Sequence, residues 1–349
     1  MRLCLLAGLL MLLLPARAPA QQVPTASAPA DIADTALADT PPDDMPIIDM
    51  DAVVVSGQQP GPGMWKVSKG DHVLYILGTL SPLPRRMQWI PDDVQKTIAQ
   101  AQAVIDPPSV KVDSDIGLFR RMFLLPSLLK ARRNPNGRTL QQVVAPDLYA
   151  RWSVLKPRYI GNDAGIEKWR PIFAAQALYE AAMRKSGLSQ KSVVQPVVEA
   201  AARKYRVPRI STLTTFMVKN PKAAIREFQD TALGDKDCFA KTMVRIETDL
   251  DGMRARANAW AVGDVEALRD LSHEDQYVVC TRAITDSALA QKLGLGNVRG
   301  RVADTWLAAA EGALARNRVS FATLPISLVM RPDGFMARLR AKGYVVEEP

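Results

Sequence analysis

The sequence predicts an α/β fold whose central mixed sheet is built from segments near the two ends of the chain. Apolar, strand-like runs occur before residue 106 and after residue 318. The long stretch between them has the apolar periodicity of helices, about 3.6 residues. We therefore expect one sheet that joins the N- and C-terminal segments and is surrounded by many helices from the middle of the chain.

The N-terminal segment predicts a hairpin followed by a strand–helix–strand unit. Residues 65–67, a turn at 69–71 and the apolar run 73–77 have the pattern of two paired strands. A helix is expected from about residue 91, and a strand at 103–105 ends at a proline pair. This order is the one clear sign of parallel pairing in the first half of the chain.

The remaining elements follow from periodicity and from turn residues. In the middle of the chain we expect helices over 171–185, 193–205 and 223–250, with a short strand at 209–212. Near the C-terminus we expect a helix over 302–316, a strand at 319–324, a helix over 335–342 and a strand at 344–346.

Residues 1–20 have the pattern of a cleaved export signal. A basic start at Arg2 precedes an apolar run at 3–14 and the sequence Ala18-Pro-Ala20, which a signal peptidase cuts. A run of about 12 apolar residues is too short to span a bilayer, which takes roughly 20. We expect a periplasmic or secreted protein with no transmembrane segment in the mature chain.

Charge separates an acidic linker from a basic body. Residues 21–51 contain seven aspartates, no lysine or arginine and no aromatic residue, so we expect them to be disordered. Residues 52–349, expected to form a single domain, carry 43 basic and 29 acidic side chains, a net charge of +14. This charge favours an envelope protein or an anionic envelope polymer as the partner. No basic stripe interleaved with aromatic residues indicates nucleic-acid binding.

Cys238 and Cys280 are the cysteines that remain after the expected cleavage. In an oxidising compartment two such residues predict a disulfide bond. The alternative is a pair of separately buried thiols. A metal role is disfavoured, because the nearest histidine, His273, is seven residues from Cys280 and does not give a typical ligand spacing.

Four segments, in their order along the chain, resemble a known family. They are a Trp65-led hairpin with Val73-Leu-Tyr-Ile-Leu-Gly-Thr-Leu-Ser81, Glu167-Lys-Trp-Arg-Pro171, Ala259-Trp-Ala-Val-Gly-Asp264, and Phe321-Ala-Thr-Leu-Pro-Ile-Ser-Leu328 followed by the helix and strand at 334–345. Together they resemble the TraB/PrgY/GumN family, which includes the Tiki-type proteases. The resemblance implies an α/β core wrapped by helices, with metal ligands drawn from both end motifs.

The chain departs from this family at the residues that would bind the metal. Where the family has Gly-Thr-x-His, this chain has Gly78-Thr-Leu-Ser81, and the histidine of the second motif is replaced by Ser327. A neutral serine hydroxyl is a poor ligand for a catalytic transition metal. Asp106 lies close to where the family places a glutamate, although the register equally allows Pro107 there. Gly78, Ser81, Asp106 and Ser327 are thus a candidate degenerate site, and we expect no metal in it.

A third acidic ligand and a serine nucleophile are also disfavoured. Where relatives have an aspartate before a helix and Leu-Glu after a strand, this chain has Gln195-Pro and Ile210-Ser-Thr212. The two histidines, His72 in a predicted exposed turn and His273 near a predicted helix end, are poorly placed for catalysis, so a Ser-His-Asp triad is not expected. A Ser-Lys arrangement stays open, since nothing selects one lysine.

These observations favour an exported, non-catalytic binding or scaffolding module of the cell envelope that needs no cofactor. The alternative is a metal-dependent hydrolase or protease with an all-oxygen site, in which Asp106 and other carboxylates hold magnesium, manganese or calcium. It requires acidic side chains that converge near Ser81. Both serine-bearing turns follow apolar strands, so they are expected to lie side by side at one end of the sheet, where open α/β sheets bind ligands.

Overall fold

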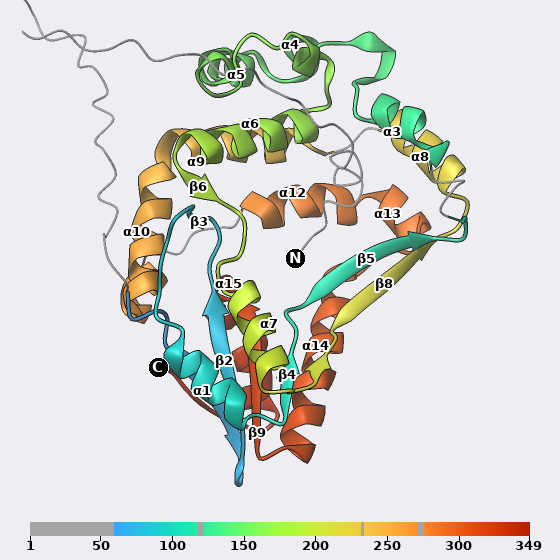
Figure 1. Ribbon diagram of the computed structural model, residues 1–349. Coiled ribbons are helices and arrows are strands. Elements are labelled where there is room, and N and C mark those ends of the chain that lie inside the picture. Colours follow the sequence, from blue (N-terminus) through green and yellow to red (C-terminus); the bar gives the residue numbers. More distant parts are fainter. Residues whose placement is uncertain (1–58, 118–121, 232–233, 271–275) are drawn as a thin grey trace, which may run out of the picture.

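A six-stranded mixed sheet joins the two ends of the chain in the computed structural model, which confirms the predicted α/β class (Figure 1). The strand order is β10-β1-β2-β9-β4-β7. Strands β2, β9, β4 and β7 are parallel to one another, whereas β1 is antiparallel to both β2 and β10. The strands are β1 Met64–Lys69, β2 His72–Thr79, β4 Ala103–Ile105, β7 Arg209–Ile210, β9 Val319–Pro325 and β10 Val345–Glu347.

The structure describes residues 59–117, 122–231, 234–270 and 276–349, and the side chains of 276–279 are left out of the description. The predicted export signal at 1–20 and the predicted linker at 21–51 lie outside the described residues. The same holds for His273.

The central strands are apolar because helices cover both faces of the sheet. Leu74, Ile76 and Leu77 of β2 are fully buried, as are Phe321 and Ala322 of β9. Such continuous apolar runs are typical of parallel strands that are buried on both sides. In Figure 1 the helices α1 and α7 lie in front of the sheet, and α14 lies behind it. Their bounds are α1 Asp92–Gln100, α7 Gln195–Lys204 and α14 Val298–Arg316.

A second, helical core lies beyond the carboxyl ends of the parallel strands (Figure 1). Trp152 of α5 and Phe239 of α9 pack at its centre, with ring centroids 5.5 Å apart. The helices that contribute are α4 Leu140–Val143, α5 Pro146–Tyr159, α6 Pro171–Lys185, α9 Lys236–Thr248 and α12 Gln276–Thr285.

Further elements pack around these two cores or extend from them. The helices are α3 Leu125–Ala131, α8 Pro221–Asp230, α10 Leu250–Val262, α11 Val265–Asp270, α13 Ala288–Lys292, α15 Ile326–Val329 and α16 Phe335–Ala341. The short helical turns are η2 Pro135–Gly137 and η3 Gly165–Lys168. Outside the main sheet, β3 Leu83–Pro84 pairs with β6 Leu188–Ser189, and β5 Ser109–Ser114 pairs with β8 Leu213–Val218.

The expected continuous helix over 223–250 is wrong, because tertiary contacts end it early. Helix α8 stops at Asp230, where the buried Arg170 guanidinium donates to the carbonyls of Phe228, Gln229 and Thr231. Helix α9 begins after Asp235, whose buried carboxylate accepts from the backbone N–H of Ile172, 3.2 Å away. Both partners come from the start of α6, so the local period of the sequence could not indicate them.

The β5–β8 pair was not expected from the sequence. The proline pair after β4 does end that strand, but the chain continues as the second strand β5 directly afterwards. In β8 the residues alternate between exposed and buried, and Phe216 on the buried side packs against Val298 and Val302 of α14. Strand β8 was not predicted because the segments on both sides of it have helical periodicity.

The predicted disulfide bond is confirmed. Cys238 of α9 and Cys280 of α12 form a bond with an S–S distance of 2.03 Å. It joins two helices of the second core across 42 residues of sequence.

We predict that Cys238→Ser/Cys280→Ser lowers the free energy of unfolding by about 4 kcal/mol, because the unfolded chain loses a closed loop of this length. Urea denaturation with and without a reductant measures the change. The reductant should have no effect on the double variant. Equal stability of the oxidised protein and the double variant would contradict the prediction.

A second prediction concerns pH. Burial raises the pKa of Asp235, against the opposing effects of its backbone hydrogen bonds and of the nearby charge of Arg170. A carboxyl whose folded-state pKa lies above its unfolded value favours folding at low pH. This contribution is lost as the pH rises through the folded-state pKa. As the pH rises through the folded-state pKa of Asp235, we predict that the wild type loses more free energy of unfolding than Asp235→Asn does. Urea denaturation of both proteins over a series of pH values measures the difference. The same pH dependence of stability in both proteins would contradict the prediction.

Candidate functional site

The two serine-bearing turns follow neighbouring parallel strands. The register between β2 and β9 pairs Gly78 with Leu324 and Thr79 with Pro325. Ser81 and Ser327 each lie two residues beyond this last pair. Since the two strands are parallel, both turns are at the carboxyl edge of the sheet, the edge where open α/β sheets bind ligands.

Gly78 allows close packing at this edge. A Cβ atom on it would lie 2.9 Å from Cζ3 of Trp65 and 3.0 Å from Cδ1 of Ile326. Its carbonyl oxygen accepts a hydrogen bond from the indole N–H of Trp260 on α10, 2.8 Å away and buried. Gly78 therefore connects the hairpin, the second serine turn and α10 at a single point.

Neither serine is arranged as a nucleophile. Both side chains are exposed, and the Ser81 hydroxyl donates over a long 3.5 Å to the carbonyl of Gln190. Ser327 lies in the short helix α15. His72 is the first residue of β2, so it is at the opposite end of that strand from Ser81, roughly 23 Å away at the usual rise per residue.

His72 is not the exposed turn residue that the sequence suggested. It is half-buried, and its Nδ1 lies 2.5 Å from the carbonyl oxygen of Leu314 near the end of α14. Nδ1 must carry the proton in this contact, because a carbonyl oxygen can only accept. The imidazole therefore helps to fix the hairpin to α14.

Asp106 directly follows β4, with its backbone N–H bonded to the carbonyl of Ile210. Its carboxylate accepts from Arg209, with Nε at 2.8 Å and Nη2 at 2.7 Å from Oδ1. Nη1 of the same arginine lies 3.4 Å from the carboxylate of Glu199. One guanidinium thus contacts two carboxylates, and a metal ion at Asp106 would have to compete with it.

The positions where relatives carry further acids are filled by neutral groups with structural contacts. Thr212 is fully buried, and its hydroxyl donates to the carbonyls of Pro107 and Asp106, at 2.8 and 3.1 Å. Gln195 donates from its side-chain amide to Glu199, one turn further along α7.

The residues at the edge do not fit a catalytic transition metal. They offer two exposed hydroxyls and one carboxylate that is already paired with Arg209. Within the described ranges, no group of three or more His, Cys, Asp and Glu side chains is arranged to hold a metal ion. The chemistry of this donor set disagrees with the metal site that the resemblance implies.

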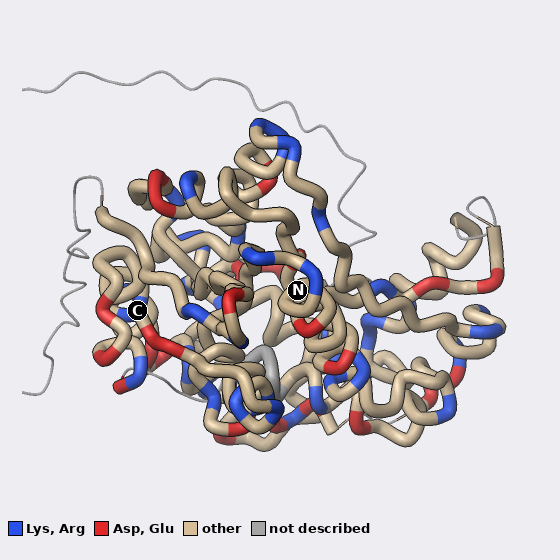
Figure 2. Tube along the Cα trace, turned by 90° about the horizontal axis from the view of Figure 1, so that it is seen from below, with Lys and Arg blue, Asp and Glu red and all other residues tan. Residues whose placement is uncertain are grey.

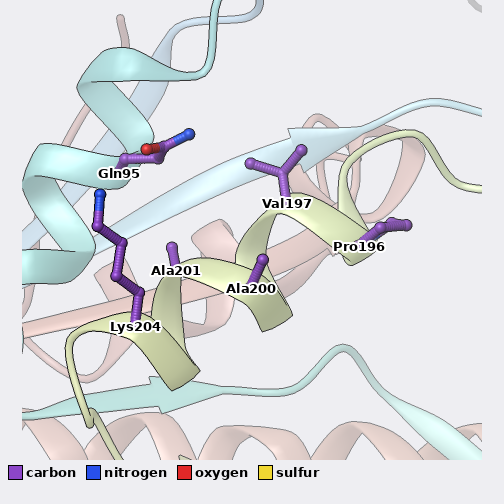
Figure 3. A pocket seen from close by; sticks show the side chains of 6 residues that line it. All are labelled: Gln95, Pro196, Val197, Ala200, Ala201 and Lys204. Atoms are coloured by element: carbon purple, nitrogen blue, oxygen red, sulfur yellow. The ribbon is translucent and has the colours of Figure 1, made fainter.

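Two cavities within the described residues lie on other elements. A groove of about 300 Å³ between α1 and α7 is shown in Figure 3, where Lys204 extends toward Gln95. Its other lining residues are Pro196, Val197, Ala200 and Ala201. A second cavity of about 680 Å³, between α9, α12 and α13, is lined by residues that include Asp237, Lys241, Arg282 and Asp286.

Comparison with models of known protein families shows to which family the chain belongs. The sequence model of the TraB/PrgY/gumN family matches residues 63–348, a range that includes both serine-bearing motifs. The chain belongs to the TraB/PrgY/gumN family. This confirms the resemblance seen in the four sequence segments. No curated protein and no solved structure matches this TraB/PrgY/gumN chain. Across the described residues, no helix has both the length and the apolar character needed to cross a membrane.

The Trp-x-x-Gly-Asp stretch of this TraB/PrgY/gumN protein has a structural purpose that sequence reasoning missed. Trp260 supplies the hydrogen bond to Gly78, and Gly263 ends α10 with a positive φ of 76°. The carboxylate of Asp264 then accepts from the N–H of Ala267 in the first turn of α11. The order of the motifs was visible in the sequence, but the contact between them spans 182 residues.

We predict that Gly78→Ala costs about 1 to 3 kcal/mol of stability, because the added methyl group meets two packed side chains and forces them to shift. Gly296→Ala is the matched control, since the nearest atom to its new Cβ is at 3.9 Å. Thermal and urea unfolding compare the two. Similar stability of both variants would show that the packing at Gly78 is loose.

Proposed function

We propose that this TraB/PrgY/gumN protein is an exported, non-catalytic binding or scaffolding module of the cell envelope with a degenerate metal site. The observation that carries this proposal is the β2–β9 register. It brings the turns of Ser81 and Ser327 to the same sheet edge. The family resemblance implies histidine ligands in these two turns. Two hydroxyls in place of two imidazoles leave too little affinity for a transition metal.

The surroundings of the two serines support the same conclusion. Arg209 already forms ion pairs with Asp106 and Glu199, so these two carboxylates are engaged with a cation and are not free to hold a metal ion. An oxygen-ligand hydrolase needs several acids that converge on one point, with little competition from cations. The contacts of Asp106 therefore favour the binding module over the hydrolase.

Export is supported by two independent features. Residues 1–20 have the composition of a signal peptide. The Cys238–Cys280 bond belongs to a class that persists in oxidising compartments such as the periplasm. Both agree with a protein that works in the envelope or beyond it.

The partner we propose is an envelope protein or an anionic envelope polymer. The body of the chain carries a net charge of +14. Figure 2 shows basic and acidic positions interspersed along the chain, without one large face of a single sign. Attraction from the net charge would act at long range and would decrease with added salt.

The experiment that tests the proposal measures metal binding by thermal unfolding. We expect no change in Tm of the wild type with a chelator or with zinc, manganese, magnesium or calcium. Ser81→His/Ser327→His should gain a saturable shift with zinc, because it restores two imidazoles at neighbouring strand ends. A ligand at 100 times its Kd stabilises by about 2.7 kcal/mol.

The control is Ser153→His/Ser192→His, which adds two histidines at exposed serines on other elements and should show no such shift. A metal-dependent shift of the wild type would contradict the proposal and favour the oxygen-ligand hydrolase, with Asp106 as the first residue to replace. A double variant that gains no shift would show that the two turns are not the positions of the family ligands.

A further inference from the structure

An arm of the molecule ends in two short helices that lie apart from the central sheet. The parallel strands β5 and β8 lead away from the sheet to α3 and α8, which lie side by side at the far end (Figure 1). The side-chain amide of Gln229 on α8 donates to the carbonyl of Ser127 on α3, 2.7 Å away. This bond helps to hold the two helices together as one tip.

The tip exposes large apolar side chains. Phe123 is 82% exposed, Met122 61% and Leu129 44%. Met122 and Phe123 lie just before α3, and Pro126 and Leu129 within it are spaced three residues apart, a spacing that brings side chains to one face of a helix. Such a cluster exposed to water is unfavourable, and on folded proteins it marks a contact surface.

Cations lie directly beside this apolar cluster. Lys130 and Arg133 are exposed at the C-terminal end of α3, and Lys222 and Arg226 are exposed on α8. Helix α3 contains no acidic residue. On α8, Glu227 is paired with Lys292 at 2.8 Å, and Asp230 is at the end of the helix. Asp115 lies beside the start of α8, where its carboxylate accepts from the N–H of Asn220. Among these side chains the cations still outnumber the acids.

We propose that the tip patch, which consists of Met122, Phe123, Leu129, Lys130 and Arg133, binds the surface of an anionic phospholipid bilayer. The apolar side chains would enter the boundary between headgroups and acyl chains, and the two cations would contact lipid phosphates. This combination of exposed Phe and Leu with Lys and Arg is typical of helices that lie in a membrane interface.

Two observations favour a lipid surface over a protein partner. Phe123 and Met122 are among the most exposed large apolar side chains of the described residues, at 82% and 61%, so they protrude far enough to enter a lipid layer. The apolar residues and cations are adjacent, an arrangement that matches the layering of headgroups above acyl chains. The inference goes beyond the proposed function, because it does not depend on whether the edge with Ser81 binds metal.

The test is flotation of the full mature chain with vesicles of phosphatidylcholine alone or with added phosphatidylglycerol. We expect binding only to the anionic vesicles, weakened by salt. Phe123→Ser should weaken this binding about tenfold, since it removes a large apolar group from the interface. Lys130→Gln/Arg133→Gln should weaken it on the order of 25-fold, about fivefold for each cation removed.

Matched controls separate the patch from the overall charge. Val154 on α5 is 71% exposed, and Val154→Ser should bind as the wild type does. Lys96→Gln/Lys204→Gln removes two exposed cations from α1 and α7 and gives the same net charge as the double tip variant. Equal weakening by the control and tip variants would overturn the proposal. No vesicle binding by the wild type would also overturn it, as would self-association that Phe123→Ser abolishes.

Discussion

The parallel pairing of β2 with β9 is the interaction on which the rest of the structure depends. It joins residues 72–79 to residues 319–325, so the sheet is completed only when the C-terminal segment returns to the N-terminal hairpin. The same pairing brings the two family motifs to one edge. A strand can make this contact at the centre of a sheet only if helices cover both of its faces, and the helices of the middle region supply this cover. The architecture of the candidate site is thus a direct consequence of how the sheet forms.

The frame of the site is intact although its ligands differ from those that the resemblance implies. Gly78 still allows Trp65 and Ile326 to pack against the strand end, and Trp260 still satisfies the buried carbonyl. These contacts involve backbone shape and apolar volume, and none of them needs a metal ion. The residues that would meet a ligand, Ser81 and Ser327, are exposed and make few contacts with this frame. For this reason the ligand side chains can change to serine without loss of the packing that positions them.

The parts of the fold that were predictable are those that depend on local pattern. The hairpin, α6 and β9 follow from alternating or helical spacing and from the turns that bound them. The predicted limits of α6 and β9 agree with the structure to within one residue, and those of the hairpin strands to within two. The break between α8 and α9 depends on Arg170 and Asp235, whose partners are far away in sequence. At the candidate site, the motifs indicated Ser81, Ser327 and Asp106, but the pairing of Asp106 with Arg209 spans 103 residues. A single sequence contains no signal for such a contact.

The sheet edge and the tip formed by α3 and α8 differ in their charged and apolar side chains. At the sheet edge, Asp106 and Glu199 share the single guanidinium of Arg209, so both carboxylates are engaged with this cation. At the end of the arm, Lys130 and Arg133 adjoin exposed apolar side chains and are not offset by an acid on the same helix. Long-range attraction brings a basic protein to an anionic surface, but it orients the protein only where charge and apolar area coincide. That coincidence occurs at the tip, and the sheet edge, which lies elsewhere on the molecule, stays accessible when the tip is bound.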